Sequence, residues 1–186
     1  KLIKNAEYVF DVGCVYDETT NKFDHHQVGG AGKRSNNIEY SSFGLVWKKF
    51  GAEICGNQKI ADLLDDKLVA PVDAWDNGFD LVRNKYDISP YFIEHIFFSM
   101  QPTWREDDLD VDVMFLKSVE MAKIILSREI IQARDVLLAE KSITDIYNNT
   151  KDKRIIILDK YYPFQSTLHN FKEPLFAIYP RKNDGS

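Results

Sequence analysis

Acidic and imidazole side chains of the kind that bind hard divalent cations recur in the first half of the chain. They are Asp11, Asp24, His25, His26, Asp73 and Asp76. Oxygen ligands joined by a few imidazoles suit Mg²⁺ or Mn²⁺, whereas Cys14 and Cys55 are too few for a thiolate zinc site. Two such cations about 3.5–4 Å apart can clamp a phosphoryl group and lower the pKa of a bound water towards ~7. The residue types therefore predict a metal site that hydrolyses phosphate esters.

A predicted strand and a short element after it must bring the first four of these side chains together. The β-branched and aromatic run 6–12 predicts a strand that carries Asp11 near its end, and the run Asp-His-His follows at 24–26. Open α/β sheets bind ligands outside the carboxyl ends of their strands, so we expect both groups at one sheet edge. Taken alone, the 24–26 run could equally be a surface turn with two solvated imidazoles.

Hydrophobic periodicity predicts two helices after this site. Residues 41–50 carry apolar side chains at helical spacing, with Ser41 or Ser42 available as the N-cap. Residues 58–75 predict a second helix, which the turn signal Asp-Asn-Gly at 76–78 closes. These helices are expected to pack on the sheet.

The second half of the chain has a different organisation. A short helix is predicted within 88–100, and residues 101–108 resemble a linker. Helical spacing recurs over 111–147 and predicts one long helix or a broken pair, while the apolar runs 154–158 and 175–179 predict strands of a smaller sheet.

This order of elements predicts an α/β fold in two domains. Residues 1–100 would form a mostly parallel sheet flanked by helices, and residues 101–186 a helical linker with part of a smaller α+β domain.

Composition excludes several classes of protein. With 44% hydrophobic residues the chain of 186 residues is expected to fold, and it has no apolar run of the roughly 18 residues that cross a membrane. Two isolated cysteines favour a reducing, intracellular compartment. The net charge of −5 argues against a broad basic surface for nucleic acid, so bound cations would have to help hold any RNA.

Several short segments together resemble one known family. They are 11–17, Phe23-Asp24-His25-His26-Gln27, 41–46, 72–78, 102–104 and 158–164. The chain resembles the family named for the melanocyte proliferating gene, in the DHH phosphoesterase superfamily. The resemblance implies a metal-dependent phosphodiesterase related to RecJ-type exonucleases and manganese pyrophosphatases, with members described as 3′-to-5′ RNA exonucleases of the mitochondrion and nucleus.

The resemblance also implies roles for individual residues. Asp11 would bridge two Mn²⁺ or Mg²⁺ ions, His25 would ligate one of them, and His26 would lie beside the scissile phosphate. Asp24 would orient an imidazole, as ligand histidines usually require. Asp73 and Asp76 match a later carboxylate motif in which either could face the metal, with Asp73 slightly favoured; Asp76 could instead belong to a helix stop.

Two basic residues in a glycine-containing loop are candidates for substrate binding. Lys33 and Arg34 follow three nearby glycines and could pair with a substrate phosphate. A solvated loop is an equal alternative.

Several departures from the family pattern affect whether this chain by itself is expected to be catalytically active. The family's opening strand, with its His and Asp-Glu ligands, is not present before Lys1, and its glycine-rich segment with paired histidines is not present after Ser186. Cys14 replaces a usual glycine, and the loop 28–33 is enlarged. We therefore expect a DHH-type domain without its first strand, and a fragment that is inactive by itself.

Two other functions stay open at this point. The same metals could hydrolyse small phosphate esters or dinucleotides, which the acidic composition mildly favours. Alternatively, the chain could be a degenerate relative that binds a partner without catalysis. A homo-oligomer also stays open, and the compartment outside the family resemblance would be the cytoplasm.

Overall fold

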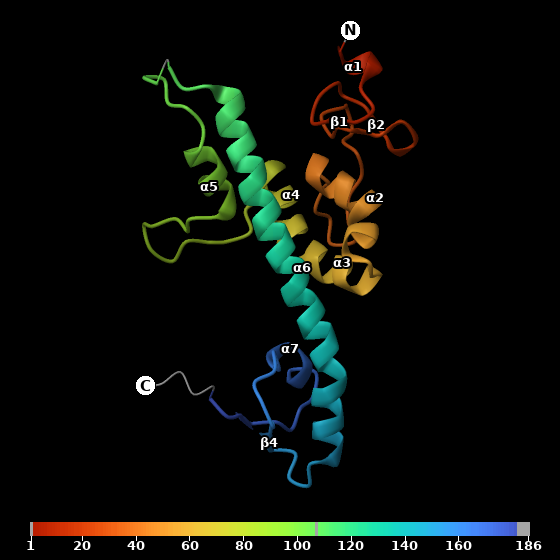
Figure 1. Ribbon diagram of the computed structural model, residues 1–186, viewed down its shortest axis with the longest axis vertical. Coiled ribbons are helices and arrows are strands. Elements are labelled where there is room, and N and C mark those ends of the chain that lie inside the picture. Colours follow the sequence, from red (N-terminus) through yellow and green to blue (C-terminus); the bar gives the residue numbers. More distant parts are fainter. Residues whose placement is uncertain (1, 107, 182–186) are drawn as a thin grey trace. The chain divides into compact units, whose positions relative to one another are not determined.

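The computed structural model describes residues 2–106 and 108–181. Contacts divide the chain into two compact units, residues 1–127 and 128–186, and the division falls within one long helix. The predicted domain boundary between residues 100 and 101 stays a prediction. Figure 1 shows the elements in chain order.

The first unit opens with a small three-stranded sheet. After helix α1 (Leu2–Asn5) come β1 (Val9–Phe10), β2 (Tyr16–Asp17), a 3₁₀ turn (Glu18–Thr20) and β3 (Lys22–Phe23). The strand order is β1-β3-β2, with β1 parallel and β2 antiparallel to β3. Phe10 lies opposite Phe23 in this register, so the residues after β1 and β3 leave the sheet at the same edge.

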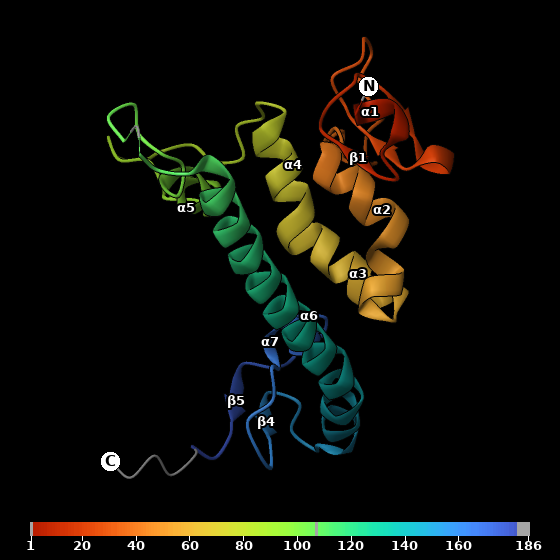
Figure 2. The ribbon, with the colours of Figure 1, turned by 45° about the horizontal axis from the view of Figure 1, so that its top comes forward.

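Three helical segments follow the sheet and pack against one another (Figure 2). Helix α2 spans Ser42–Cys55, α3 spans Gln58–Leu64 and α4 spans Ala70–Asp76. A π-helical turn, Asp65–Val69, joins α3 to α4. Pro71, whose nitrogen has no hydrogen to donate, lies in the first turn of α4. The helix predicted over 41–50 is confirmed, with Ser41 as its N-cap, and the one predicted over 58–75 is this interrupted α3–α4 pair.

The core of this unit comes from the apolar faces of the sheet and helices. Its fully buried side chains include Phe23 of β3, Leu45 of α2 and Leu64 of α3. Gly44 of α2 lies so close to α4 that an added Cβ would lie 1.8 Å from an Asp73 carboxylate oxygen. The absence of a side chain at position 44 therefore sets how closely α2 and α4 approach.

Helix α5 (Ile93–Ser99) and helix α6 (Val111–Asn149) complete the main helices. The pattern over 111–147 therefore forms one long helix, as one of the two predicted alternatives proposed. None of the helices in the described ranges combines the length and apolarity needed to span a membrane.

The second unit has a core of its own. Strands β4 (Ile155–Ile157) and β5 (Phe176–Ile178) pair in parallel, and α7 (Gln165–Leu168) lies between them in sequence. Ile143 and Ile156 are fully buried in its apolar cluster. Both predicted strands are confirmed. The chain combines helices with small sheets, as predicted, but the sheet of the first unit is mixed, with one parallel and one antiparallel pairing. The DHH-type arrangement of the sheet stays a prediction.

Candidate metal centre

Four predicted residues converge at the edge where β1 and β3 end. Ligand atoms of Asp11, Asp24, His25 and His26 all lie within 4.8 Å of one another. Asp11 directly follows β1 and Asp24 directly follows β3, and the Asp11 amide donates to the Phe23 carbonyl at 3.0 Å. The parallel pairing of two very short strands is what places these two carboxylates together.

Asp24 is the buried anchor of this cluster, with 1% of its surface exposed. Its Oδ2 accepts from the Cys14 amide at 2.6 Å, and its Oδ1 accepts from the His26 amide at 3.1 Å. Burial by itself would raise the Asp24 pKa, but the bonds from His26 and Cys14 outweigh it and hold the pKa below its ordinary value. Asp24 is therefore an ionised group inside the fold.

The His26 ring is oriented by Asp24. Its Nδ1 lies 2.7 Å from Asp24 Oδ1, and the hydrogen bond with this carboxylate raises the His26 pKa. The ring also stacks on His25 with centroids 4.2 Å apart. Because Nδ1 of the half-exposed His26 ring contacts Asp24, Nε2 on the opposite side of the ring is directed away from Asp24. Asp24 thus contacts an imidazole, as its expected role requires, and the role itself stays a prediction.

His25 is the more enclosed of the two histidines. Its Nδ1 accepts from the Ser42 amide at 3.2 Å and lies 3.7 Å from Asp11 Oδ1. Its Nε2 lies 3.3 Å from Asp76 Oδ2. The ring thus joins the sheet edge to the end of α4.

Asp76 and Asp73, one helical turn apart on α4, face different surroundings. Asp76 faces His25, and burial together with the charge of Asp11 raises the Asp76 pKa, although His25 opposes this. Asp73 is fully buried, and its oxygens accept from Ser41 Oγ at 2.6 Å, the Gly44 amide at 2.9 Å and Arg34 Nη1 at 2.7 Å. The geometry favours Asp76 over Asp73 as the residue directed at the cluster.

Arg34 lies inside the unit, and Lys33 lies on its surface. The Arg34 guanidinium forms a two-pronged ion pair with Asp65 at 2.8 and 2.7 Å and a further one with Asp73. These two carboxylates raise the Arg34 pKa although its burial acts in the opposite direction, so the group is charged. Lys33 is exposed, in an isolated bridge to Glu39. Substrate binding by either residue stays a prediction, and for Arg34 it would require an exchange of partners.

Two contributors to this region were not identified from the sequence. Ser42 contacts both Asp11 and His25, and Asp65 pairs with Arg34. The helical spacing over 41–50 indicates only a capping role for a serine at position 41 or 42. The Arg34–Asp65 pair joins residues 31 positions apart, which no local spacing reveals.

The donor set of the cluster fits a hard divalent cation. Carboxylate oxygens and imidazole nitrogens are the ligand types that Mn²⁺ and Mg²⁺ accept, and no cysteine sulfur belongs to the cluster found in the described residues. Burial raises the pKa of Asp76, and the charge of Asp11 raises it further; a cation would relieve this repulsion between the two carboxylates.

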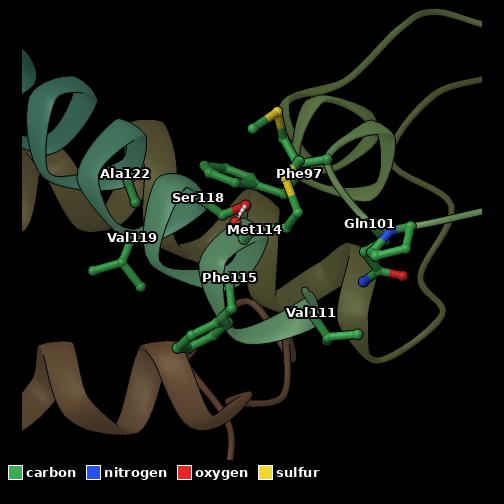
Figure 3. Close-up of a pocket in the computed structure, with 10 residues that line it drawn as sticks. Phe97, Gln101, Val111, Met114, Phe115, Ser118, Val119 and Ala122 are labelled. Carbon is green, nitrogen blue, oxygen red and sulfur yellow. Dashed lines mark hydrogen bonds between the residues drawn. The ribbon is translucent and has the colours of Figure 1, made fainter. Parts of the chain in front are cut away.

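A groove of a different character lies between α5 and the first turns of α6 (Figure 3). Its volume is about 760 Å³, and its wall includes Phe97 of α5 and the following Met100, together with Met114, Phe115 and Val119 of α6. None of the described residues in this wall carries an acid or an imidazole group. The groove therefore offers no ligands for a cation.

Comparison with known proteins adds a family to this geometry. A family model for the MYG1 exonucleases, described as an uncharacterised protein family (UPF0160), matches residues 1–185. The chain belongs to this MYG1 family. The resemblance to the family named for the melanocyte proliferating gene is thus confirmed.

Curated MYG1 relatives are similar to the chain at modest identity. A MYG1 protein of Dictyostelium discoideum is 28% identical over 92% of the chain and 59% of its own length. A MYG1 protein of Schizosaccharomyces pombe is 24% identical over 96% of the chain and 64% of its own length. Human MYG1 exonuclease is 24% identical over 65% of the chain and 38% of its own length. The chain thus spans about three fifths of the first two relatives. No solved structure matches it.

Proposed function

We propose that the protein is a metal-dependent phosphodiester hydrolase that acts as a 3′–5′ exonuclease on single-stranded RNA. The convergence of Asp11, Asp24, His25 and His26 at the carboxyl ends of β1 and β3 carries this proposal. The name MYG1 exonuclease, given to the human and rat relatives, supports nuclease chemistry. Location in the mitochondrion and nucleus belongs to the same proposal.

The proposed cation site uses the side chains directed at the sheet edge. Asp11, His25 and Asp76 would hold Mn²⁺ or Mg²⁺, in a two-cation centre to which Asp73 could contribute only by leaving its present partners. When bound, such cations supply Lewis-acid polarisation of a phosphoryl oxygen and a more acidic bound water.

His26 is proposed to act on the phosphate itself. Asp24 favours the protonated imidazole, and the Nδ1 contact with Asp24 leaves Nε2 as the donor towards an approaching phosphate oxygen. A fixed, charged donor of this kind stabilises the negative charge that develops on a phosphoryl oxygen during hydrolysis. Asp24 would hold the ring in that orientation throughout.

Substrate binding is proposed to be local. The net charge of −5 gives no general attraction for a polyanion, so the cations, His26 and exposed Lys33 would hold one or two phosphates at a time. Such binding suits the end of a single strand better than a duplex.

Degradation of RNA by the intact gene product containing these residues tests the proposal. The substrate would be single-stranded RNA labelled at its 5′ end, with Mn²⁺ added. We expect stepwise shortening from the 3′ end, and a loss of rate of about 100-fold or more in Asp11→Ala and His25→Ala. His95→Ala on α5 is the matched control. Unchanged rates in both site variants would overturn the mechanism.

A hydrolase of small phosphate esters or dinucleotides is the second candidate. The acidic composition favours it, because a small substrate needs no extended basic surface. Competition between an oligonucleotide and a dinucleotide in the same assay separates the two. Preferential cleavage of the dinucleotide would support the second candidate.

A further inference from the structure

Ser42 contacts two members of the metal cluster at once. Its hydroxyl donates to Asp11 Oδ1 at 3.0 Å, and its backbone amide donates to His25 Nδ1 at 3.2 Å. Ser42 is buried at the start of α2. One residue thus connects a carboxylate after β1 with an imidazole after β3.

The N-cap of α2 explains why the Ser42 amide can donate to a group outside the helix. Ser41 caps the helix, since its Oγ accepts from the Phe43 amide at 3.3 Å. Ser42 is therefore the first helical residue, and its amide is among those that have no partner inside the helix. His25 Nδ1 supplies that partner. The two adjacent hydroxyls have different acceptors: Ser41 Oγ donates to Asp73, and Ser42 Oγ donates to Asp11 in the metal cluster.

Asp11 is the cluster member that most needs such a partner. It has a left-handed backbone with φ of 58°, and 61% of its side chain is exposed. A short, exposed carboxylate would otherwise sample several rotamers. With the Ser42 hydroxyl in place, Asp11 Oδ1 lies 3.7 Å from His25 Nδ1 and 3.8 Å from His26 Nδ1.

We propose that Ser42 is a positioning residue of the metal centre, which holds Asp11 and His25 in register before a cation binds. The inference rests on the proposed metal-dependent function. Groups that support metal ligands commonly change metal affinity by about 10–100-fold when they are removed, because the ligands must then be ordered at the moment of binding. Ser42 makes no use of its own oxygen as a ligand in this role.

Three variants of the chain test the proposal: Ser42→Ala, Ser42→Thr and, as a matched control, Ser41→Ala. Mn²⁺ affinity is measured from the electron paramagnetic resonance signal of free Mn²⁺, and the melting temperature is measured without metal. We expect Ser42→Ala to bind Mn²⁺ about 10–100-fold more weakly with little change in the metal-free melting temperature. Ser42→Thr, which keeps the hydroxyl, should restore binding. Ser41→Ala should lower the metal-free melting temperature and affect Mn²⁺ binding less.

The outcomes separate this proposal from the metal centre itself. Equal Mn²⁺ affinity in the wild type and Ser42→Ala would overturn the positioning role and leave the metal centre standing. A wild type that binds no Mn²⁺ would overturn both. A Ser42→Ala variant that loses melting temperature and affinity together, without recovery in Ser42→Thr, would show a role in folding and also overturn the proposal.

Discussion

Individual side chains at the cluster have protonation states that the fold sets. The hydrogen bonds that Asp24 accepts keep it ionised despite its burial, and its charge in turn favours the protonated ring of His26. Through this coupling, the buried Asp24 carboxylate favours the charged form of the half-exposed His26 ring. The same residue therefore affects both stability and the proposed phosphate contact.

The Asp24–His26 pair should make stability depend on pH near neutrality. Because the folded protein raises the His26 pKa, this proton stabilises the fold fully below the unfolded pKa of ~6.5, and the stabilisation is lost as pH rises through the folded pKa. Asp24→Asn should bring the His26 pKa down towards its ordinary value and flatten that part of the pH profile. Titration of the His26 ring proton by NMR measures the first effect, and urea unfolding at several pH values the second. A His26 pKa that stays raised in Asp24→Asn would contradict the assigned cause.

Arg34 should matter to stability more than a surface arginine does. Only 8% of its side chain is exposed, and its removal would leave the fully buried Asp73 carboxylate without a positive partner. Loss of one partner of a buried pair costs about 3–5 kcal/mol, so Arg34→Leu should lower the free energy of unfolding by roughly that amount. Chemical denaturation measures it.

The neighbouring Lys33 provides the control for Arg34. Lys33→Leu alters an exposed side chain and should change the free energy of unfolding by no more than about 0.5 kcal/mol. Similar small effects in both variants would show that the Arg34 ion pairs contribute little. The double variant Arg34→Leu/Asp73→Asn should recover part of the loss, since it removes the unpaired charge as well.

At the scale of elements, the close approach of α2 and α4 depends on Gly44. An alanine there would place its Cβ 1.8 Å from Asp73 Oδ2, and the backbone would have to move because Asp73 is held by Ser41 and Arg34. Overpacking of this kind costs about 1–3 kcal/mol or more, so Gly44→Ala should lower the melting temperature markedly. Glu53→Ala, on an exposed position of the same helix, is the control. Equal melting temperatures in the two variants would contradict the tight packing.

Local pattern was sufficient to predict helices α2, α5 and α6 and the placement of the cluster near a strand end. The periodicity over 41–50 gives α2 with its serine cap. The strand predicted over 6–12 forms only at Val9–Phe10, because Asp11 adopts a left-handed backbone that leaves the extended conformation. The choice between Asp73 and Asp76 could not be made locally, because residues one turn apart at a helix end differ only in what packs beside them. Here Arg34, 39 positions away from Asp73 in sequence, forms an ion pair with Asp73, whereas Asp76 faces His25.

At the scale of the whole molecule, the metal cluster and the second hydrophobic core belong to different units. Every residue of the metal cluster lies within residues 1–127. Ile143, by contrast, is fully buried in the hydrophobic core of unit 128–186. Ile143→Ala leaves a cavity and should destabilise the second unit by about 2–5 kcal/mol. Because no ligand of the proposed centre is contributed by that unit, Mn²⁺ affinity should stay within about twofold of wild type.

Hydrogen exchange resolved by residue measures the destabilisation of the second unit in Ile143→Ala, and titration with Mn²⁺ measures the affinity. Leu138→Ala, at an exposed position of the same helix, should change neither quantity. A parallel loss of exchange protection and Mn²⁺ affinity in Ile143→Ala would show that the two units are energetically coupled.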